Sequence, residues 1–170
     1  MSNLEKIQKG MRGLLALSKI VLFMAIVGWA FTVIGAALVA SGVVGMENWL
    51  GQLLETTAGI TRKQLTGTLL ASSVPFLFGG IFTAFLCRYF KEERKAGTPF
   101  TNTGADRIKE LGLLQIGLTV LTLVITDGIY EEIGLLEWNR YDDAGGIVLG
   151  IFLILLSTVF RYGAELEQRT

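Results

Sequence analysis

The sequence contains no histidine, one cysteine and two prolines among its 170 residues. Without histidine the chain lacks a side chain that many metal centres and acid-base catalysts use. The single Cys87 allows neither an internal disulfide nor a cysteine-rich zinc site. No cofactor-binding motif is present. We therefore expect no cofactor and no metal site.

Charge is also missing from long parts of the chain, because 51% of the residues are hydrophobic and only 18% are charged. A membrane-spanning helix needs about 20 mostly apolar residues. The apolar stretch 111–126 is too short to cross a membrane alone, so we expect its helix to extend into charged residues at both ends. The uncharged stretch 20–46 is longer than the apolar core of a secretory signal peptide, so we interpret it as a membrane anchor that is retained. The predicted fold is an all-α, four-helix membrane bundle that forms one domain, with spans at residues 20–46, 64–87, 111–128 and 144–161.

The basic residues divide unevenly between the two sides that these spans define. Twelve of the fifteen lie in the N-terminal leader, the segment between the second and third spans, and the C-terminal tail, which gives +5 on that side and −5 on the other. Basic segments stay in the cytoplasm, so both termini and the central segment are predicted to be cytoplasmic. We expect the leader, residues 1–19, to form a short helix on the inner membrane surface.

The central segment is predicted to be a long helical hairpin that protrudes into the cytoplasm. Gly97 and Pro99 predict that its first helix ends near Ala96, because glycine favours helix ends and proline cannot continue a helix. Thr103 and Asp106 have the spacing of a capping box that would begin the next helix. The connector would then be about six residues long.

Aromatic and basic side chains gather at this hairpin and form our candidate partner-binding site. Phe100 is interpreted either as a local staple against the following helix or as an anchor for a soluble partner. Cationic side chains around it would attract an acidic partner. The candidate residues are Arg94, Lys95, Pro99, Phe100 and Arg107.

Small residues predict where helices approach one another closely. Gly28, Gly35 and Gly42 recur at intervals of seven in the first span, and Gly146 and Gly150 begin the last. Such stripes favour close helix packing, against either another helix of the chain or a second copy. Pro75 should bend the second span, with nearby serine hydroxyls satisfying the carbonyls that it leaves unbonded.

Acidic residues dominate the segment 127–143, which we expect to be an outer loop. It lacks the alternating acidic pattern of a calcium-binding loop. No span has a charged residue at its middle, where proton relays and ion pathways have them. For the same reason we interpret the chain as a non-enzyme.

Two motifs carry a family resemblance. The first is Gly97-Thr98-Pro99-Phe100-Thr101 with Arg107-Ile108-Lys109, and the second is the tail from Leu156 to Leu166, which reads Leu-Ser-Thr-Val-Phe-Arg-Tyr-Gly-Ala-Glu-Leu. With these the chain resembles a bacterial family of small four-span membrane proteins of unknown function. Gly104 departs from that pattern, where a polar residue is expected. The resemblance implies a bacterial cytoplasmic membrane location and, since such proteins are often encoded beside a helix-turn-helix regulator, a soluble transcriptional regulator as partner.

Two functions remain open at this stage. The first is a regulatory or sensing protein whose cytoplasmic hairpin binds a soluble regulator, with no direct contact to nucleic acid. The second is a small transporter or channel that works as a homo-oligomer. In both, the lipid bilayer surrounds the four helices.

Overall fold

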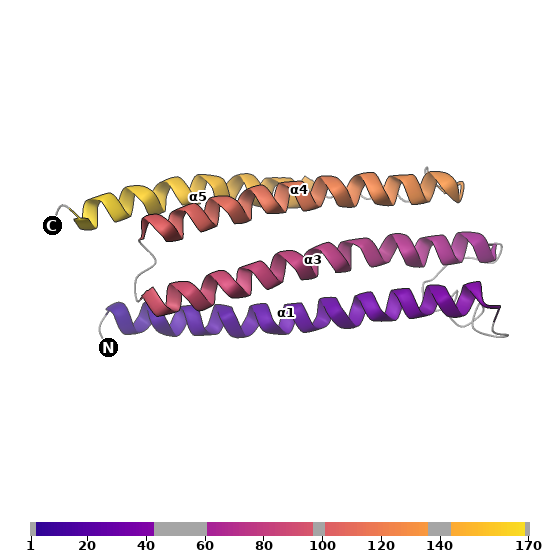
Figure 1. The fold of residues 1–170 in the computed structure, drawn as a ribbon, viewed down its shortest axis with the longest axis horizontal. Coiled ribbons are helices and arrows are strands. Elements are labelled where there is room, and N and C mark those ends of the chain that lie inside the picture. The colour runs from indigo at the N-terminus through magenta and orange to yellow at the C-terminus, as the bar shows by residue number, and fades with distance from the viewer. Residues whose placement is uncertain (1–2, 43–60, 97–100, 136–143, 169–170) are drawn as a thin grey trace. The chain divides into compact units, whose positions relative to one another are not determined.

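The computed structural model describes residues 3–42, 61–96, 101–135 and 144–168, and these residues form four α-helices with no strand (Figure 1). The all-α, four-helix prediction is confirmed. The third helix does extend into charged residues at both ends, as its short apolar stretch required. The helices are α1 (Asn3–Ala40), α3 (Arg62–Ala96), α4 (Asn102–Glu132) and α5 (Ala144–Gln168).

All four helices are long and apolar enough to cross a membrane. A helix of 35 residues such as α3 is about 52 Å long at 1.5 Å per residue, which exceeds the roughly 30 Å hydrocarbon core. Large apolar side chains are exposed along the helices, among them Phe23 at 67%, Val124 at 65% and Leu155 at 63%. In water such surfaces would drive association, whereas lipid covers them without cost. The chain is a multi-pass α-helical membrane protein.

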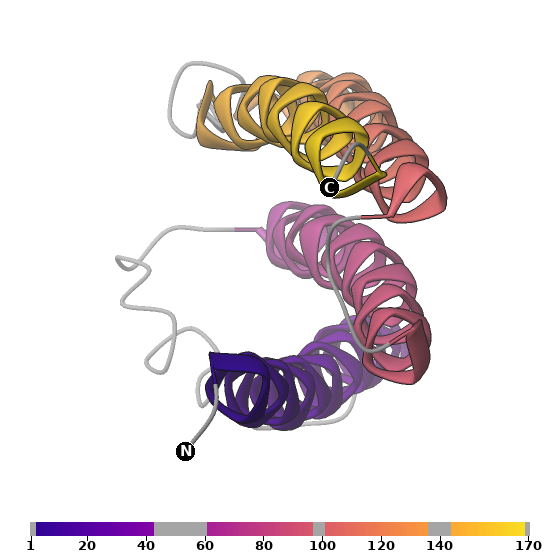
Figure 2. The ribbon, with the colours of Figure 1, turned by 90° about the vertical axis from the view of Figure 1, so that its left-hand side faces the viewer.

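The chain forms two compact units, and the first contains Met1–Phe23, Gly79–Val120 and Asp143–Thr170. Figure 2 views the chain from the side on which α1 and α5 of this unit carry the two termini. Tyr89, Ile108 and Leu111 are buried at its centre, where α3 meets α4. Side chains of α5 cover this cluster, namely Leu153, Leu156 and Phe160.

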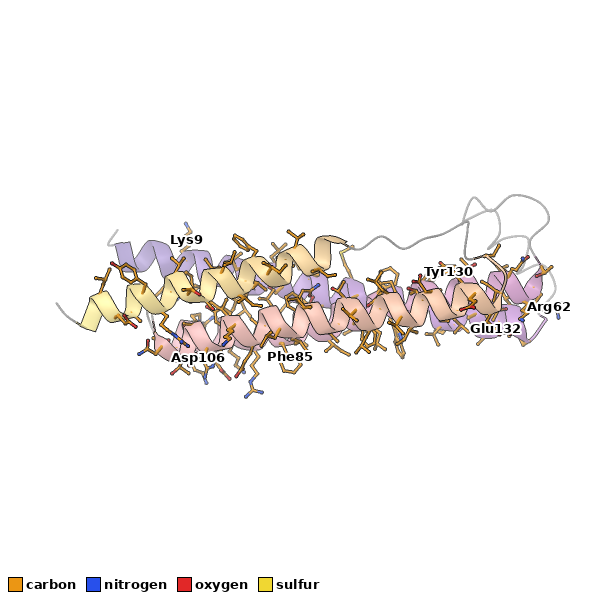
Figure 3. All side chains as sticks on the ribbon, turned by 90° about the horizontal axis from the view of Figure 1, so that it is seen from above. Lys9, Arg62, Phe85, Asp106, Tyr130 and Glu132 are labelled. Atoms are coloured by element: carbon orange, nitrogen blue, oxygen red, sulfur yellow. The ribbon has the colours of Figure 1, made fainter. Side chains whose placement is uncertain are left out.

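The second unit contains Met24–Phe78 and Leu121–Asp142. Ala36 and Val39 of α1 are buried against Leu65 and Leu69 of α3. The other side of α3 packs on α4, where Ala71 contacts a cluster centred on Tyr130 and Ile133. At the edge of this contact the Lys63 ammonium donates to a Glu132 carboxylate oxygen at 2.9 Å. Figure 3 labels Tyr130, Glu132 and Arg62 in this region.

The N-terminal leader is not a separate surface helix, and that expectation is wrong. Residues from Asn3 to Ala40 form one continuous helix, so leader and first span share an axis. This part of the sequence contains no proline, and Gly10 and Gly13 are too weak as helix breakers to interrupt a run rich in leucine and alanine.

The second span also stays helical through Pro75. Proline removes the donor that would reach the carbonyl of Ala71, four residues earlier. The Ser73 hydroxyl donates instead to the neighbouring carbonyl of Leu70 at 2.6 Å. The expected rescue of the freed carbonyl by serine is therefore wrong for Ser73.

Two glycines in the left-handed conformation end helices at other residues than the sequence predicted. Gly42 has φ 74° and its N–H donates to the carbonyl of Val39, so α1 ends at Ala40, before the expected limit at Met46. Gly134 has φ 70°, its N–H donates to the carbonyl of Glu131, and the N–H of Leu135 donates to the carbonyl of Tyr130. This pair of bonds is a Schellman motif. Residues 127–132 are consequently helical, and the expectation that the outer loop begins at Asp127 is wrong.

Candidate functional site

The candidate site lies in the first unit, where α3 ends and α4 begins. α3 ends at Ala96, as Gly97 and Pro99 predicted. Tyr89 is buried on the last turns of α3, and its ring lies 5.4 Å from that of Phe90, centroid to centroid. Ile108 and Leu111 of α4 pack against Tyr89. This apolar contact fixes the two helix ends beside each other, so that the charged residues around it have defined neighbours.

The first turn of α4 is capped by Thr101. Its hydroxyl accepts a hydrogen bond from the Gly104 N–H at 2.8 Å, and its carbonyl accepts one from the Ala105 N–H at 2.9 Å. The capping box expected at Thr103 and Asp106 is wrong, because the helix begins at Asn102 and both residues lie inside it. A cap must come directly before the first helical residue, and Thr101 holds that position.

Glu93 is the buried acid of this site. Its side chain is 1% exposed, although it lies in the charged run from Lys91 to Lys95. One carboxylate oxygen, Oε1, lies 3.4 Å from Arg107 Nη1. The other, Oε2, has no hydrogen-bond partner among the described residues. The same oxygen lies 2.8 Å from the place where a Cβ atom on Gly104 would be. Gly104 therefore admits the carboxylate to the first turn of α4, where partial positive charge favours an anion.

Arg107 joins α4 to α3 through two acids. Its Nη2 lies 2.9 Å from Glu92 Oε2, in addition to its contact with Glu93. Glu92 also accepts a hydrogen bond from Arg88 Nε at 3.1 Å, at the i, i+4 spacing on α3. Arg107 is thus an internal partner of the hairpin. Its assignment to the partner-binding set stays a prediction.

Glu92 and Glu93 lie beyond the uncharged run 64–87 of α3, and their environments shift their pKa values in opposite directions. Burial raises the pKa of the Glu93 carboxyl above its ordinary value, and the Arg107 charge only partly offsets this. The hydrogen bond from Arg88, together with nearby positive charges, lowers the pKa of Glu92. Adjacent acids therefore differ because one faces the interior and the other faces cations.

Asp106 gives α4 a second link, this time to α5. Its carboxylate forms an ion pair with the Arg161 guanidinium. Figure 3 labels Asp106 close to the beginning of α4. Both side chains are more than half exposed, so the pair contributes less than about 1 kcal/mol to stability. Its effect is to orient the end of α5 against the hairpin.

The remaining partner-binding candidates are placed in two ways. Arg94 and Lys95 are exposed on the last turn of α3. Pro99 and Phe100 lie outside the described residues, so both interpretations of Phe100 stay predictions. Of the five candidates, the structure thus presents Arg94 and Lys95 at the surface and holds the partly exposed Arg107 in ion pairs with Glu92 and Glu93.

The glycines expected in the first span have different surroundings. A Cβ atom on Gly28 would lie 2.7 Å from the Phe76 ring of α3, so α1 and α3 approach closely there. Gly35 is buried. Gly42 ends the helix, and a Cβ atom there would lie 2.9 Å from the Arg62 guanidinium. At Gly28 the glycine face of α1 is thus occupied by α3 of the same chain.

Gly150 brings the last helix, α5, close to the backbone of α4. A Cβ atom there would lie 2.7 Å from the carbonyl oxygen of Gly112 on α4 and 2.5 Å from the Ile116 side chain. Gly146, one turn earlier, is also buried. Gly112 is not among the packing glycines predicted from the sequence, although a glycine in an apolar helix is the signal that could have identified it.

The fold and this site define a multi-pass α-helical membrane protein with an ion-paired helical hairpin at one end. Comparison with protein-family models, with curated proteins and with solved structures finds no match to this chain.

Proposed function

We propose that this chain is a regulatory interaction protein of the bacterial cytoplasmic membrane. In this proposal both termini and the α3–α4 hairpin face the cytoplasm, and the end of the hairpin binds a soluble helix-turn-helix regulator. The protein reaches nucleic acid only through that regulator. The surrounding bilayer is its other partner.

The observation that supports the proposal is the separation of charge within the run Lys91-Glu92-Glu93-Arg94-Lys95. In sequence the two acids offset most of the three bases. In the structure Glu93 is buried and Glu92 is paired with Arg88 and Arg107, whereas Arg94 and Lys95 are exposed. The hairpin therefore presents positive charge outward from a firmly held end. Such a surface attracts an acidic partner and orients it.

Transport is the weaker candidate. The buried hydroxyls of Thr32, Thr83, Thr126 and Ser157 donate to carbonyls of their own helices. Within the part of the chain that the structure describes, these polar groups are thus occupied by backbone atoms rather than turned toward a cargo.

The test is a capture experiment with the full chain in neutral detergent. We expect a helix-turn-helix regulator to be encoded beside this chain, and that regulator, purified separately, is the soluble bait. Charge reversal of Arg94→Glu with Lys95→Glu should weaken its binding by roughly tenfold or more, since steering pairs become repulsive. Binding by the unchanged protein should also weaken as salt is added.

The matched control is Lys9→Glu with Arg12→Glu, two exposed cations on α1 of the same unit. It reverses the same amount of charge on α1, which is not part of the proposed regulator surface, and should leave binding unchanged. Equal loss in both double variants would indicate general attraction to any basic surface. Failure of the regulator to bind the unchanged protein would overturn the proposed function.

A further inference from the structure

The first unit contains a cavity of about 460 Å³ between α1 and α3. α1 contributes Leu15 and Lys19 to its walls. α3 contributes Cys87, Arg88, Lys91 and Arg94. Four of these six residues are cations, and none is an acid. The cavity is therefore a concave site of one charge sign.

The helical spacing of these residues explains why they share one space. Leu15 and Lys19 are four residues apart, and Cys87, Lys91 and Arg94 follow one another at intervals of four and three. Such intervals place side chains on one face of a helix. The first part of α1 and the last part of α3 lie side by side in both views (Figures 1 and 2). The cavity is thus formed where two helix faces meet.

These cations lack the acids that balance charge elsewhere in the unit. Arg88 pairs with Glu92 on its own helix. Lys19, Lys91 and Arg94 form no ion pair with any residue that the structure describes. Cations that face a shared space repel one another, whereas an anion bound between them would attract each of them. The lining therefore suits a ligand with concentrated negative charge, such as a phosphate group.

The position of the cavity along the helices indicates where that phosphate comes from. Lys19 directly precedes the uncharged run 20–46, and Arg88 directly follows the uncharged run 64–87. Both cations therefore lie at the boundary between apolar and polar parts of the chain, at the depth of lipid headgroups. Exposed Ile20 and Phe23 follow Lys19 on α1 and offer an apolar surface to acyl chains.

We infer that this cavity binds the phosphate of an anionic phospholipid, with Lys19, Lys91 and Arg94 as its cationic ligands. The headgroup enters between α1 and α3, and the acyl chains follow the exposed apolar faces into the membrane. The site shares Arg94 with the proposed regulator surface, whereas Lys19 and Lys91 belong to the cavity alone. A bound lipid would hold α1 against α3 at this end of the unit.

The test uses the full chain in neutral detergent, with phosphatidylglycerol or phosphatidylcholine of identical acyl chains added to the micelles. Two properties are measured, the rate at which N-ethylmaleimide alkylates Cys87 in the cavity wall and the midpoint of thermal unfolding. Phosphatidylglycerol should slow the alkylation several-fold and raise the midpoint. Phosphatidylcholine should do neither. Equal effects of the two lipids on the unchanged protein would overturn the inference without any variant.

Substitution then assigns the effect to the cavity. Lys19→Gln, Lys91→Gln and Arg94→Gln combined should reduce the apparent affinity for phosphatidylglycerol by roughly tenfold or more. The matched control combines Lys9→Gln, Arg12→Gln and Lys109→Gln, which are exposed cations outside the cavity. It should retain the affinity of the unchanged protein. Equal loss in both sets would overturn the site by showing nonspecific charge attraction.

A third arm separates lipid from soluble phosphate. Inorganic phosphate and glycerol phosphate are added to the same detergent solution at the concentration used for the lipid. Neither should protect Cys87, because without acyl chains the ligand loses its apolar contacts. Protection by either at the level of phosphatidylglycerol would overturn the lipid assignment in favour of a soluble phosphate site.

Discussion

A buried carboxylate such as Glu93 normally costs free energy, because burial removes the water that stabilises its charge. Three features of the hairpin reduce this cost. Arg107 lies 3.4 Å from one oxygen, and the first turn of α4 lies beside the other. Gly104 lacks the Cβ atom that would block that approach. The departure from the polar residue expected at position 104 thus has a physical reason.

The pH dependence of stability should have opposite signs at the two neighbouring acids. The raised pKa of Glu93 means that the folded state holds its proton more tightly than the unfolded state does. Its contribution to stability is therefore present at low pH and is lost as pH rises through the folded pKa. In Glu93→Gln this loss is absent, so its unfolding midpoint should rise relative to the unchanged protein as pH rises above the ordinary carboxyl pKa.

Glu92→Gln is the matched control for that experiment. The pKa of Glu92 is lowered in the folded state, so its contribution is present above the ordinary carboxyl pKa and is lost as pH falls. Relative to the unchanged protein, the midpoint of this variant should fall as pH rises toward the ordinary carboxyl pKa. Thermal unfolding in detergent at several pH values measures how the midpoint difference between each variant and the unchanged protein changes with pH. Slopes of equal sign would contradict the burial of Glu93 described above.

The helix boundaries show how much of each element a pattern can predict. Hydrophobicity located the four helices, because each needs a long apolar run to cross a membrane. Local backbone geometry set their ends, through the left-handed glycines 42 and 134 and the cap at Thr101. In the sequence, Gly42 continues the seven-residue spacing of Gly28 and Gly35, so spacing alone predicted a packing glycine rather than a helix-ending one. A helix-ending glycine and a packing glycine differ in φ, which a sequence does not state.

The candidate site was predictable to a smaller extent. Its place at the hairpin followed from the concentration of basic residues, and the exposure of Arg94 and Lys95 agrees with it. The internal roles of Arg107 and Glu93 depend on residues 14 positions apart meeting across two helices. A one-dimensional pattern cannot distinguish which of several neighbouring charges will face inward.

The α4–α5 contact gives a direct test at the scale of the element. Gly150→Ala places a Cβ atom 2.7 Å from the Gly112 carbonyl oxygen and 2.5 Å from Ile116, so the helices must separate. We expect the free energy of unfolding to fall by about 1–3 kcal/mol. The control is Gly117→Ala on α4, where nothing lies within 4 Å of the added atom. It should be neutral or slightly stabilising, since alanine favours helix by roughly 0.5–1 kcal/mol.

Detergent-solubilised protein and chemical or thermal unfolding measure both variants. Gly150→Ala should be clearly less stable than Gly117→Ala. Equal stability of the two alanine variants would show that α4 and α5 do not meet at Gly112 and Gly150.

At the scale of the whole molecule, function depends on which side of the membrane the hairpin occupies. Twelve of the fifteen basic residues share one predicted side with the hairpin. The regulator-binding surface requires that side to be the cytoplasm. The lipid site requires only that the cavity lie at headgroup depth, so the two proposals can fail separately.

Cysteine accessibility in intact cells tests this orientation most directly. In a Cys87→Ala background, Thr103→Cys reports the exposed first turn of α4 and Glu131→Cys the exposed last turn. A membrane-impermeant maleimide should label Glu131→Cys in intact cells and Thr103→Cys only after permeabilisation. Labelling of Thr103→Cys from outside intact cells, with Glu131→Cys protected, would contradict the cytoplasmic hairpin and the proposed function with it.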